Sequence, residues 1–342
     1  MVWSVPFVFG GKGLKARILQ LLREQEGYVS GQDICRELSV SRTAVWKAIG
    51  QLKDEGYVIE AVQNKGYRLL DSPDLVTEEE VVSRLHTKWA GHPTVFLEKT
   101  DSTNNEAKRR AEAGAGHGML VIAEKQEAGK GRRGRSWSSP SGSGIWMTLL
   151  LKPEFSPSQA AMLTLVAAMA AEAGIRKETG LETGIKWPND IVIKGRKVCG
   201  ILTEMSAEPD YINHVVIGIG INVNVEAFPE ELQDTATSLC LEMGHKVKRA
   251  GIIAEIWKAF EEYYEKFMET ADLQPLKEMY ESRLLNLGRE VCVLAPRGEW
   301  RGIAKGIDRL GRLLIEPSDE TDKTWKAVDS GEVSVRGVYG YV

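Results

Sequence analysis

The sequence predicts an α+β protein of several domains: a winged helix-turn-helix at the N-terminus, a central body of alternating strands and helices, and a small SH3-like β-barrel at the C-terminus. Three observations support this fold class. Apolar residues recur at helical spacing near the N-terminus and then give way to a hairpin pattern. Short apolar runs alternate with longer helical patterns through the middle of the chain. From residue 290 onward, short strands are punctuated by glycine.

The first 70 residues have the pattern of a winged helix-turn-helix. Apolar spacing predicts a helix from about residue 14 that ends before Gly27. Ser30 and Ser41 are placed to cap a second and a third helix, which are separated by a tight turn at Ser39-Val40. Hairpin strands follow at residues 57–62 and 67–70. The helix-turn-helix itself spans about residues 31–50.

The third helix carries the predicted DNA-binding residues. Thr43 and Lys47 lie opposite its apolar face at 100° per residue, and Arg42 and Trp46 flank them. Residues 1–70 hold 10 Lys+Arg against 7 Asp+Glu, a balance of +3, within a chain whose net charge is −4. This asymmetry favours nucleic acid as a partner, although a winged helix used only for protein contacts is the alternative. The expected DNA contacts are Ser41, Arg42, Thr43, Trp46 and Lys47.

Composition indicates a cytoplasmic protein without a membrane partner. The four cysteines are scattered without a C-x-x-C pair, and the five histidines are dispersed, so neither a disulfide framework nor a protein metal site is expected. The first nine residues are apolar but too short for a bilayer span and lack a basic signal region. Segment 71–74 breaks both periodicities. The expected organisation is a disordered tail at 1–13, the winged helix at 14–70, a linker at 71–76, a central domain at 77–286 and the C-terminal domain at 287–342.

A cationic loop between Glu124 and Gly144 joins two predicted core strands. It places Lys130, Arg132, Arg133 and Arg135 within six residues, spaced by glycines. Like charges repel and glycine raises the entropic cost of ordering, so we expect a mobile loop that folds around a phosphate. A dinucleotide-binding G-x-G-x-x-G is disfavoured, because no helix starts at these glycines. A merely solvated basic loop is the simpler alternative.

Further candidate ligand-binding residues are spread over the central region. Lys197 follows a predicted hairpin turn and Lys186 precedes that hairpin, so each is a candidate point charge for a carboxylate or phosphate. Most hairpin lysines are simply solvated. Run 101–104 either caps a helix or binds a polar ligand group. Glycines within strands often mark close approach by a ligand, and bulge formation is an equally good explanation. The remaining candidates are Ser102, Thr103, Asn104, Trp137, Gly200, Gly218, Gly220 and Asn222. With no nucleophile–base pair evident, electrostatic catalysis of nucleotidyl transfer is the natural reaction class.

Taken together, these segments resemble the bifunctional biotin–protein ligase and biotin-operon repressor family from about residue 14 onward. The ordered set is specific although each fragment alone is weak. It comprises Asp101-Ser102-Thr103-Asn104, Gly129-Lys130-Gly131-Arg132-Arg133-Gly134-Arg135, Lys186-Trp187-Pro188-Asn189-Asp190, Arg196-Lys197-Val198-Cys199-Gly200-Ile201-Leu202 and Gly218-Ile219-Gly220-Ile221-Asn222. The winged helix distinguishes repressor-type members from those that only ligate.

The resemblance implies a central domain like that of class II synthetases, with a mixed sheet flanked by helices. It implies that biotin and ATP, with Mg²⁺ screening the phosphates and no metal bound by the protein alone, give biotinyl-5'-AMP. A lysine of a biotin carboxyl carrier domain, of the acetyl-CoA carboxylase type, then takes the biotin. It further implies that the adenylate-bound protein forms a homodimer and binds operator DNA.

The resemblance also assigns site residues. Lys197 and Arg132 are the expected catalytic residues. The expected biotin contacts are Ser102, Thr103, Asn104, Gln126, Lys130, Gly131, Arg132, Lys197 and Gly200. The expected ATP and adenylate contacts are Arg132, Arg135, Trp137, Lys186, Asn189, Gly218, Gly220 and Asn222.

One position departs from the family pattern. The family's loop more often has arginine where this chain has Lys130, which keeps the charge but loses the bidentate fork. Two alternatives stay open on the sequence: a lipoate-type ligase, and a non-enzymatic, ligand-sensing repressor.

Overall fold

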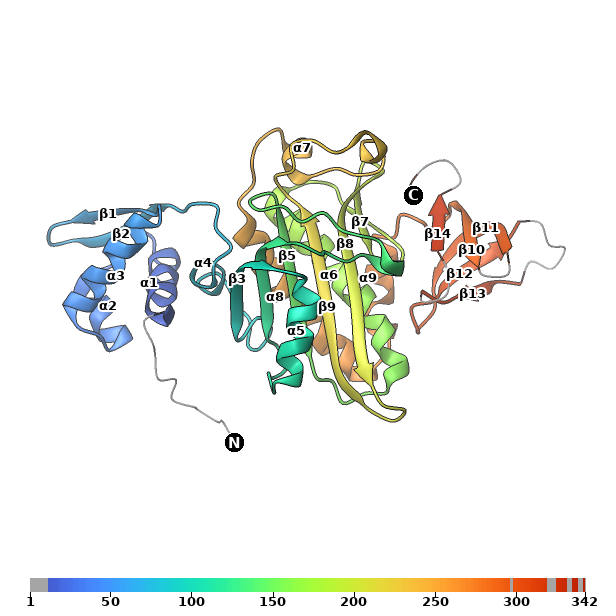
Figure 1. Cartoon of the computed structure of the whole chain (residues 1–342), viewed down its shortest axis with the longest axis horizontal. Coiled ribbons are helices and arrows are strands. Elements are labelled where there is room, and N and C mark those ends of the chain that lie inside the picture. The colour runs from blue at the N-terminus through green and yellow to red at the C-terminus, as the bar shows by residue number, and fades with distance from the viewer. Residues whose placement is uncertain (1–11, 296–297, 319–323, 331–333, 338–340, 342) are drawn as a thin grey trace. The chain divides into compact units, whose positions relative to one another are not determined.

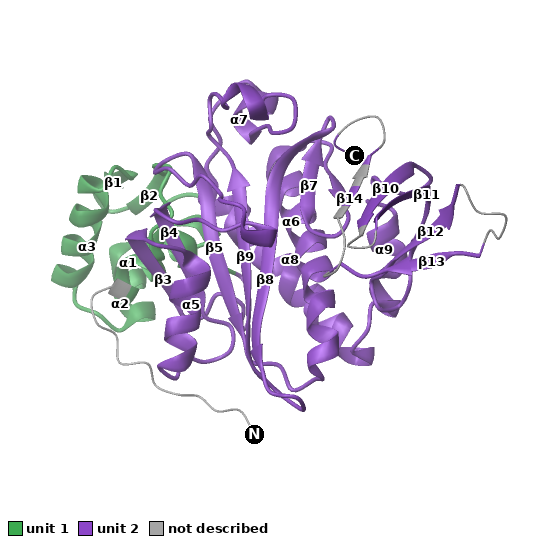
Figure 2. Ribbon diagram, turned by 45° about the vertical axis from the view of Figure 1, so that its right-hand side comes forward, with its two compact units in different colours: residues 1–85 green, residues 86–342 purple. Residues whose placement is uncertain are grey.

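The computed structural model describes residues 12–295, 298–318, 324–330, 334–337 and 341. The chain divides into two compact units, residues 1–85 and 86–342 (Figures 1 and 2). Most of the disordered tail expected at residues 1–13 lies outside the described residues. Its last two residues, Lys12 and Gly13, begin a helix instead.

The first unit is a winged helix-turn-helix. Helices α1 (Lys12–Glu24), α2 (Gly31–Leu38) and α3 (Arg42–Asp54) precede strands β1 (Val58–Val62) and β2 (Gly66–Asp71), which pair antiparallel. The two predicted caps are present: the hydroxyl oxygens of Ser30 and Ser41 accept hydrogen bonds from the backbone N–H groups of Asp33 and Ala44. The apolar faces of the three helices pack together around Ile18, Ile34 and Leu52, none of which is exposed.

A further short helix, α4 (Glu78–Val82), is fastened to the winged helix by a buried carboxylate. Glu80 is 1% exposed. It accepts hydrogen bonds from Arg23 at 2.8 and 2.9 Å, from Tyr57 at 2.8 Å and from Arg84 at 2.8 Å. A buried charge needs such partners, so α4 stays with the first unit. The unit boundary therefore lies after Leu85, later than the expected start of the central domain at residue 77.

The second unit is built on a seven-stranded mixed sheet with strand order β3-β4-β5-β9-β8-β7-β6. Strands β3 and β4 are parallel and the other neighbours are antiparallel, which confirms the mixed sheet. The strands are β3 (Thr94–Thr100), β4 (Leu120–Gln126), β5 (Gly144–Leu151), β6 (Gly184–Lys186), β7 (Asp190–Ile193), β8 (Arg196–Ala207) and β9 (Ile212–Asn222).

Helices cover both faces of this sheet. Helix α5 (Thr103–Glu112) packs on Val121, Leu150 and Val216. Helix α6 (Leu163–Thr179) lies on the opposite face, where Thr164 bonds Thr203, and it packs against α8 (Arg249–Thr270). The apolar pattern of residues 156–179 predicts one long helix, but the segment before α6 is the 3₁₀ helix η2 (Pro157–Met162). The helical stretch Pro157–Thr179 is long and apolar enough to cross a membrane, but 72% of its most apolar window is buried within the protein.

Short helices and a second sheet complete this unit. The short helices are η1 (Arg132–Gly134), η3 (Glu230–Leu232), α7 (Leu239–Met243), η4 (Gln274–Leu276) and α9 (Lys277–Glu281). The second sheet has the order β13-β12-β11-β10-β14, formed by β10 (Glu290–Ala295), β11 (Gly298–Ile307), β12 (Leu313–Pro317), β13 (Lys326–Val328) and β14 (Ser334–Gly337). This small antiparallel domain is the predicted C-terminal β domain. The sequence pattern also predicts a strand at residues 332–335, of which 332 and 333 lie outside the described residues and Ser334 and Val335 lie in β14.

Candidate functional site

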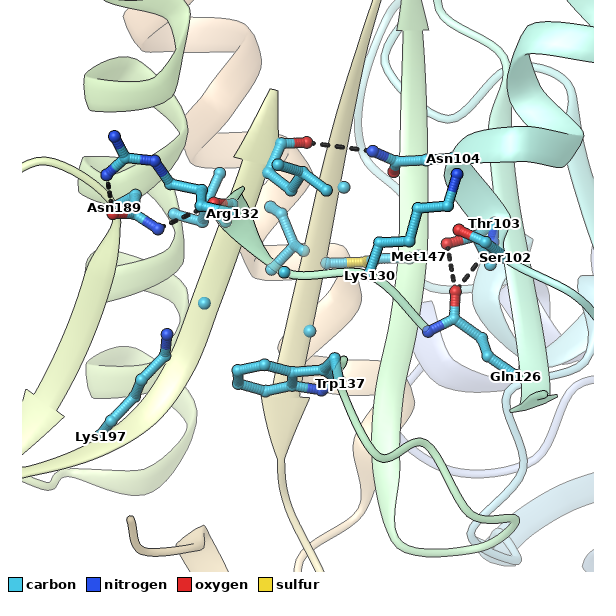
Figure 3. Close-up of a pocket in the computed structure, with 17 residues that line it drawn as sticks. Ser102, Thr103, Asn104, Gln126, Lys130, Arg132, Trp137, Met147, Asn189 and Lys197 are labelled. Atoms are coloured by element: carbon cyan, nitrogen blue, oxygen red, sulfur yellow. Dashed lines mark hydrogen bonds between the residues drawn. The ribbon is translucent and has the colours of Figure 1, made fainter. Parts of the chain in front are cut away.

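A pocket opens on the α5 face of the central sheet (Figure 3). It brings together residues from α5, the cationic loop and strands β5, β8 and β9. The lining residues are Ser102, Thr103, Asn104, Gln126, Lys130, Gly131, Arg132, Trp137, Met147, Asn189, Lys197, Gly200, Ile201, Leu202, Gly218, Ile219 and Gly220.

One end of the pocket is a buried polar cluster at the N-terminus of α5. Gln126 Oε1 accepts hydrogen bonds from the backbone N–H of Thr103 at 2.8 Å and from its hydroxyl at 3.1 Å. Gln126 Nε2 donates to Ser139 Oγ at 2.8 Å. Ser102 is the N-cap residue but makes no side-chain capping bond, which leaves its buried hydroxyl available to a ligand.

The side chain of Asn104 connects α5 to the sheet. Its amide donates to the Leu202 carbonyl at 3.2 Å and to Glu204 Oε2 at 2.8 Å. Burial alone would raise the pKa of Glu204, but hydrogen bonds from Lys108 and Asn104 hold that pKa below its usual value. Asn104 Oδ1 lies over Gly218, where a Cβ atom would come within 2.1 Å of it. The space expected for a ligand over this strand glycine is therefore occupied by the Asn104 side chain.

Trp137 lies across the middle of the pocket, over two cross-strand glycines (Figure 3). A Cβ on Gly220 would come within 2.9 Å of the indole Nε1, and one on Gly200 within 3.0 Å of Cζ3. Because neither glycine has a side chain, the indole can lie directly against the sheet. The indole Nε1 is buried and has no hydrogen-bond partner among the described residues, so it is a donor that a ligand can satisfy.

The cationic loop is folded back on itself by short-range bonds. The Trp137 amide donates to Gly129 O at 2.8 Å, and the Gly131 amide to Arg135 O at 2.7 Å. Lys130 is exposed and donates to Asn105 Oδ1 at 2.8 Å. The guanidinium of Arg132 donates to Asn189 Oδ1 at 2.9 Å and also to the Ser330 carbonyl.

The two cations assigned to catalysis lie on the same side of the pocket. Burial lowers the pKa of Arg132, and the nearby Asp190 charge opposes that shift. Lys197 Nζ lies 2.5 Å from Asp190 Oδ1 and 5.0 Å from the centre of the Trp137 ring. Its side chain is 23% exposed, so the ammonium faces the pocket rather than bulk water.

Thirteen of the predicted ligand contacts line the pocket, and three do not. Arg135 is exposed on the loop. Lys186 is buried, with its ammonium 3.7 Å from the centre of the Tyr341 ring. Asn222 is buried and donates to Thr237 O at 3.2 Å. Sequence reasoning assigned no role to Asp190, which ion-pairs with Lys197, or to four apolar residues that line the pocket, although all of these except Met147 stand in the quoted motifs. The apolar residues are Met147, Ile201, Leu202 and Ile219.

In the first unit, α3 presents the predicted DNA-reading face to solvent. Arg42, Thr43 and Lys47 are exposed, and Trp46 is 71% exposed. Ser41 is also exposed, but its hydroxyl is engaged as the helix cap, so a DNA contact from it would use another lone pair or its backbone. A solvent-facing indole flanked by cations suits contacts with both base edges and phosphates.

Three protein families match successive parts of the chain. Residues 15–68 match a helix-turn-helix domain, residues 96–222 match the biotin/lipoate A/B protein ligase family, and residues 287–336 match the biotin protein ligase C-terminal domain.

Whole-chain relatives agree with this order of domains. The bifunctional ligase/repressor BirA of Bacillus spizizenii is 44% identical over 88% of this chain and 93% of its own. That of Escherichia coli is 31% identical over 94% of this chain and 96% of its own. A biotin protein ligase from Aquifex aeolicus, solved with biotin and ATP, superposes with a TM-score of 0.62 and 32% identity over 71% of this chain and 98% of that one.

Proposed function

We infer the function from one premise: this chain belongs to the family of bifunctional biotin ligase/repressors. Of the two alternatives left open by the sequence, the non-enzymatic repressor is disfavoured, because the ligase domain is present with a formed pocket. We propose that the protein activates biotin with ATP, transfers biotin to a carrier lysine and represses transcription when it holds the adenylate.

The proposal rests mainly on how polar and charged groups are distributed between the two ends of the pocket. The Ser102–Gln126 cluster at one end offers hydrogen-bond donors and acceptors, and Lys197 and Arg132 supply positive charge at the other. Biotin has the matching polarity, with a ureido group at one end and a carboxylate at the other. The dithiolane ring of lipoate has no N–H or C=O group to match the polar cluster, which favours biotin over lipoate.

The proposed chemistry brings two anions together. A biotin carboxylate oxygen bonds to the α-phosphorus of ATP, the bond from that phosphorus to the bridging oxygen breaks, and pyrophosphate leaves. Lys197 and Arg132 stabilise the negative charge on the α-phosphate, while the loop around Trp137 excludes water. The amine of a carrier lysine then attacks the biotinyl carbonyl, loses a proton and releases AMP.

Magnesium is expected to arrive with ATP rather than in a protein cage. Among the residues described, no group of three or more His, Cys, Asp or Glu side chains is placed to hold a metal ion. Mg²⁺ commonly binds substrate phosphates and keeps several waters, so a pocket that supplies cations for the same phosphates fits that mode. The ion would screen phosphate charge during the attack.

The DNA-binding half of the proposal rests on the exposed face of α3. Operator DNA is the expected partner of Arg42, Thr43, Trp46 and Lys47. One helix-turn-helix covers one half-site of an operator. We therefore propose that the adenylate-bound form pairs into a homodimer, which presents two helix-turn-helix units to the DNA. The carrier domain competes by consuming the adenylate. A reducing cytoplasm suits the four cysteines, which are all free thiols.

The ligase assignment is tested by incubating the full chain with ATP, labelled biotin and an apo biotin carboxyl carrier domain. We expect ATP-dependent label on a single carrier lysine, with release of pyrophosphate and AMP. Parallel reactions with lipoate and an apo lipoyl domain test the second ligase class. Labelling with lipoate but not with biotin would overturn the proposal, and so would the absence of label from both.

A further inference from the structure

We propose that Tyr341 and Asp190 are positioning residues for Lys197, so that Tyr341, far from the catalytic strands in the sequence, supports the ligase site. This inference rests on the proposed function, because it assigns a role through the lysine that stabilises the reacting phosphate. Neither residue lines the pocket.

Tyr341, Asp190 and Lys197 are connected in series, each contacting the next. The Tyr341 hydroxyl donates to Asp190 Oδ2, and the other carboxylate oxygen, Oδ1, lies 2.5 Å from Lys197 Nζ. An ammonium has three N–H donors, so a contact with Asp190 through one of them leaves two for a carboxylate and an α-phosphate. Asp190 can therefore hold the ammonium in place without blocking its contacts with the reacting groups.

Tyr341 is itself fixed at two points. Its hydroxyl engages Asp190, and its ring lies 3.7 Å from the ammonium of Lys186, which is Asp190's cross-strand partner between β6 and β7. A cation over an aromatic face is attracted to it. Because ring and hydroxyl are anchored on neighbouring strands, the hydroxyl direction is set by the sheet.

An orienting group is needed here for an electrostatic reason. The Asp190 side chain is only 12% exposed and lies beside the position where two substrate anions meet. A carboxylate free to rotate would repel those anions and would draw the ammonium away from them. Hydrogen bonding one of its oxygens to Tyr341 commits the other to Lys197. The expected consequence is a slower chemical step without weaker biotin binding, since the polar biotin end lies elsewhere in the pocket.

The test compares Tyr341→Phe, Asp190→Asn and the double variant in biotin-dependent pyrophosphate exchange. Phenylalanine keeps the ring over Lys186 and removes only the hydroxyl. A hydrogen bond to a charged group is worth enough that Tyr341→Phe should lower kcat about tenfold. KM for biotin and the thermal midpoint should stay near wild type. Tyr211→Phe is the matched control, because Tyr211 is exposed between β8 and β9 and lies outside the pocket.

The double variant distinguishes positioning from a general structural effect. If Tyr341 acts through Asp190, its substitution should add little to Asp190→Asn, whereas independent effects would multiply. A Tyr341→Phe enzyme with wild-type kcat overturns the inference, as does full multiplication in the double variant. A lower thermal midpoint that accounts for the lost activity also overturns it. Absence of exchange in the wild-type protein would instead overturn the proposed function, and the inference with it.

Discussion

Replacing Lys197 by alanine is expected to slow adenylate formation by about 10² to 10³-fold, which matches the loss of one preorganised donor to a developing oxyanion. A unit charge about 4 Å from the phosphate at an effective dielectric of 20 contributes about 4 kcal/mol, or roughly 10³-fold. The 23% exposure of the side chain reduces this through solvent screening. Against that, the substitution leaves the Asp190 carboxylate uncompensated beside the reacting anions.

The assay for this prediction is biotin-dependent exchange of labelled pyrophosphate into ATP. Lys194→Ala is the matched control, because Lys194 sits on the same hairpin, is 72% exposed and pairs with Glu242 away from the pocket. The control should leave exchange unchanged. Adding Asp190→Asn to Lys197→Ala should restore part of the rate, since it removes the stranded charge. Exchange within about threefold of wild type in Lys197→Ala would refute the assignment.

Two further substitutions and two truncations probe the loop and the first unit. Arg132→Gly removes the tie between the loop and Asn189, so biotinyl-AMP should escape faster and label bystander proteins; unchanged adenylate retention and carrier specificity would contradict a lid role. Deleting residues 1–85 should keep carrier biotinylation within about tenfold of the intact chain and abolish DNA binding. Deleting only residues 1–70 leaves the Glu80 carboxylate without Arg23 and Tyr57, so this truncation should have the lower thermal midpoint. Equal thermal midpoints of the two truncations would argue against the Glu80 contacts. Trp46→Ala should weaken operator binding by about tenfold in a gel shift while leaving ligation intact, and undiminished affinity would remove Trp46 from the interface.

The parts of the fold predicted from sequence are those that depend on local periodicity. Helix caps at Ser30 and Ser41 and the hairpin of β7 and β8 follow from residues that are close in the chain. The boundary after Leu85 could not be predicted in this way, because Arg23 and Glu80 meet only after the chain has folded.

The candidate site shows the same division. Residues of the ordered motifs gather around one pocket, but the strand glycines accommodate protein side chains where the sequence suggested a ligand. What occupies the space over those glycines was beyond the sequence: Asn104 and Trp137 fill it. Contacts from the C-terminal region, made by Ser330 and Tyr341, join parts of the chain with no shared pattern.

The central claim is that one ligand, the adenylate, joins ligation to repression. Linkage sets an upper limit: the adenylate can strengthen DNA binding only by as much as it favours the dimer-competent state over the other state. The most direct measurement is operator affinity by gel shift at fixed salt, with the dimer fraction followed in parallel, for the protein alone, with biotin and ATP, and with apo carrier domain added. We predict that biotin plus ATP raises both affinity and dimer fraction, and that the carrier domain reverses both. Equal operator affinity in all three conditions would contradict this account.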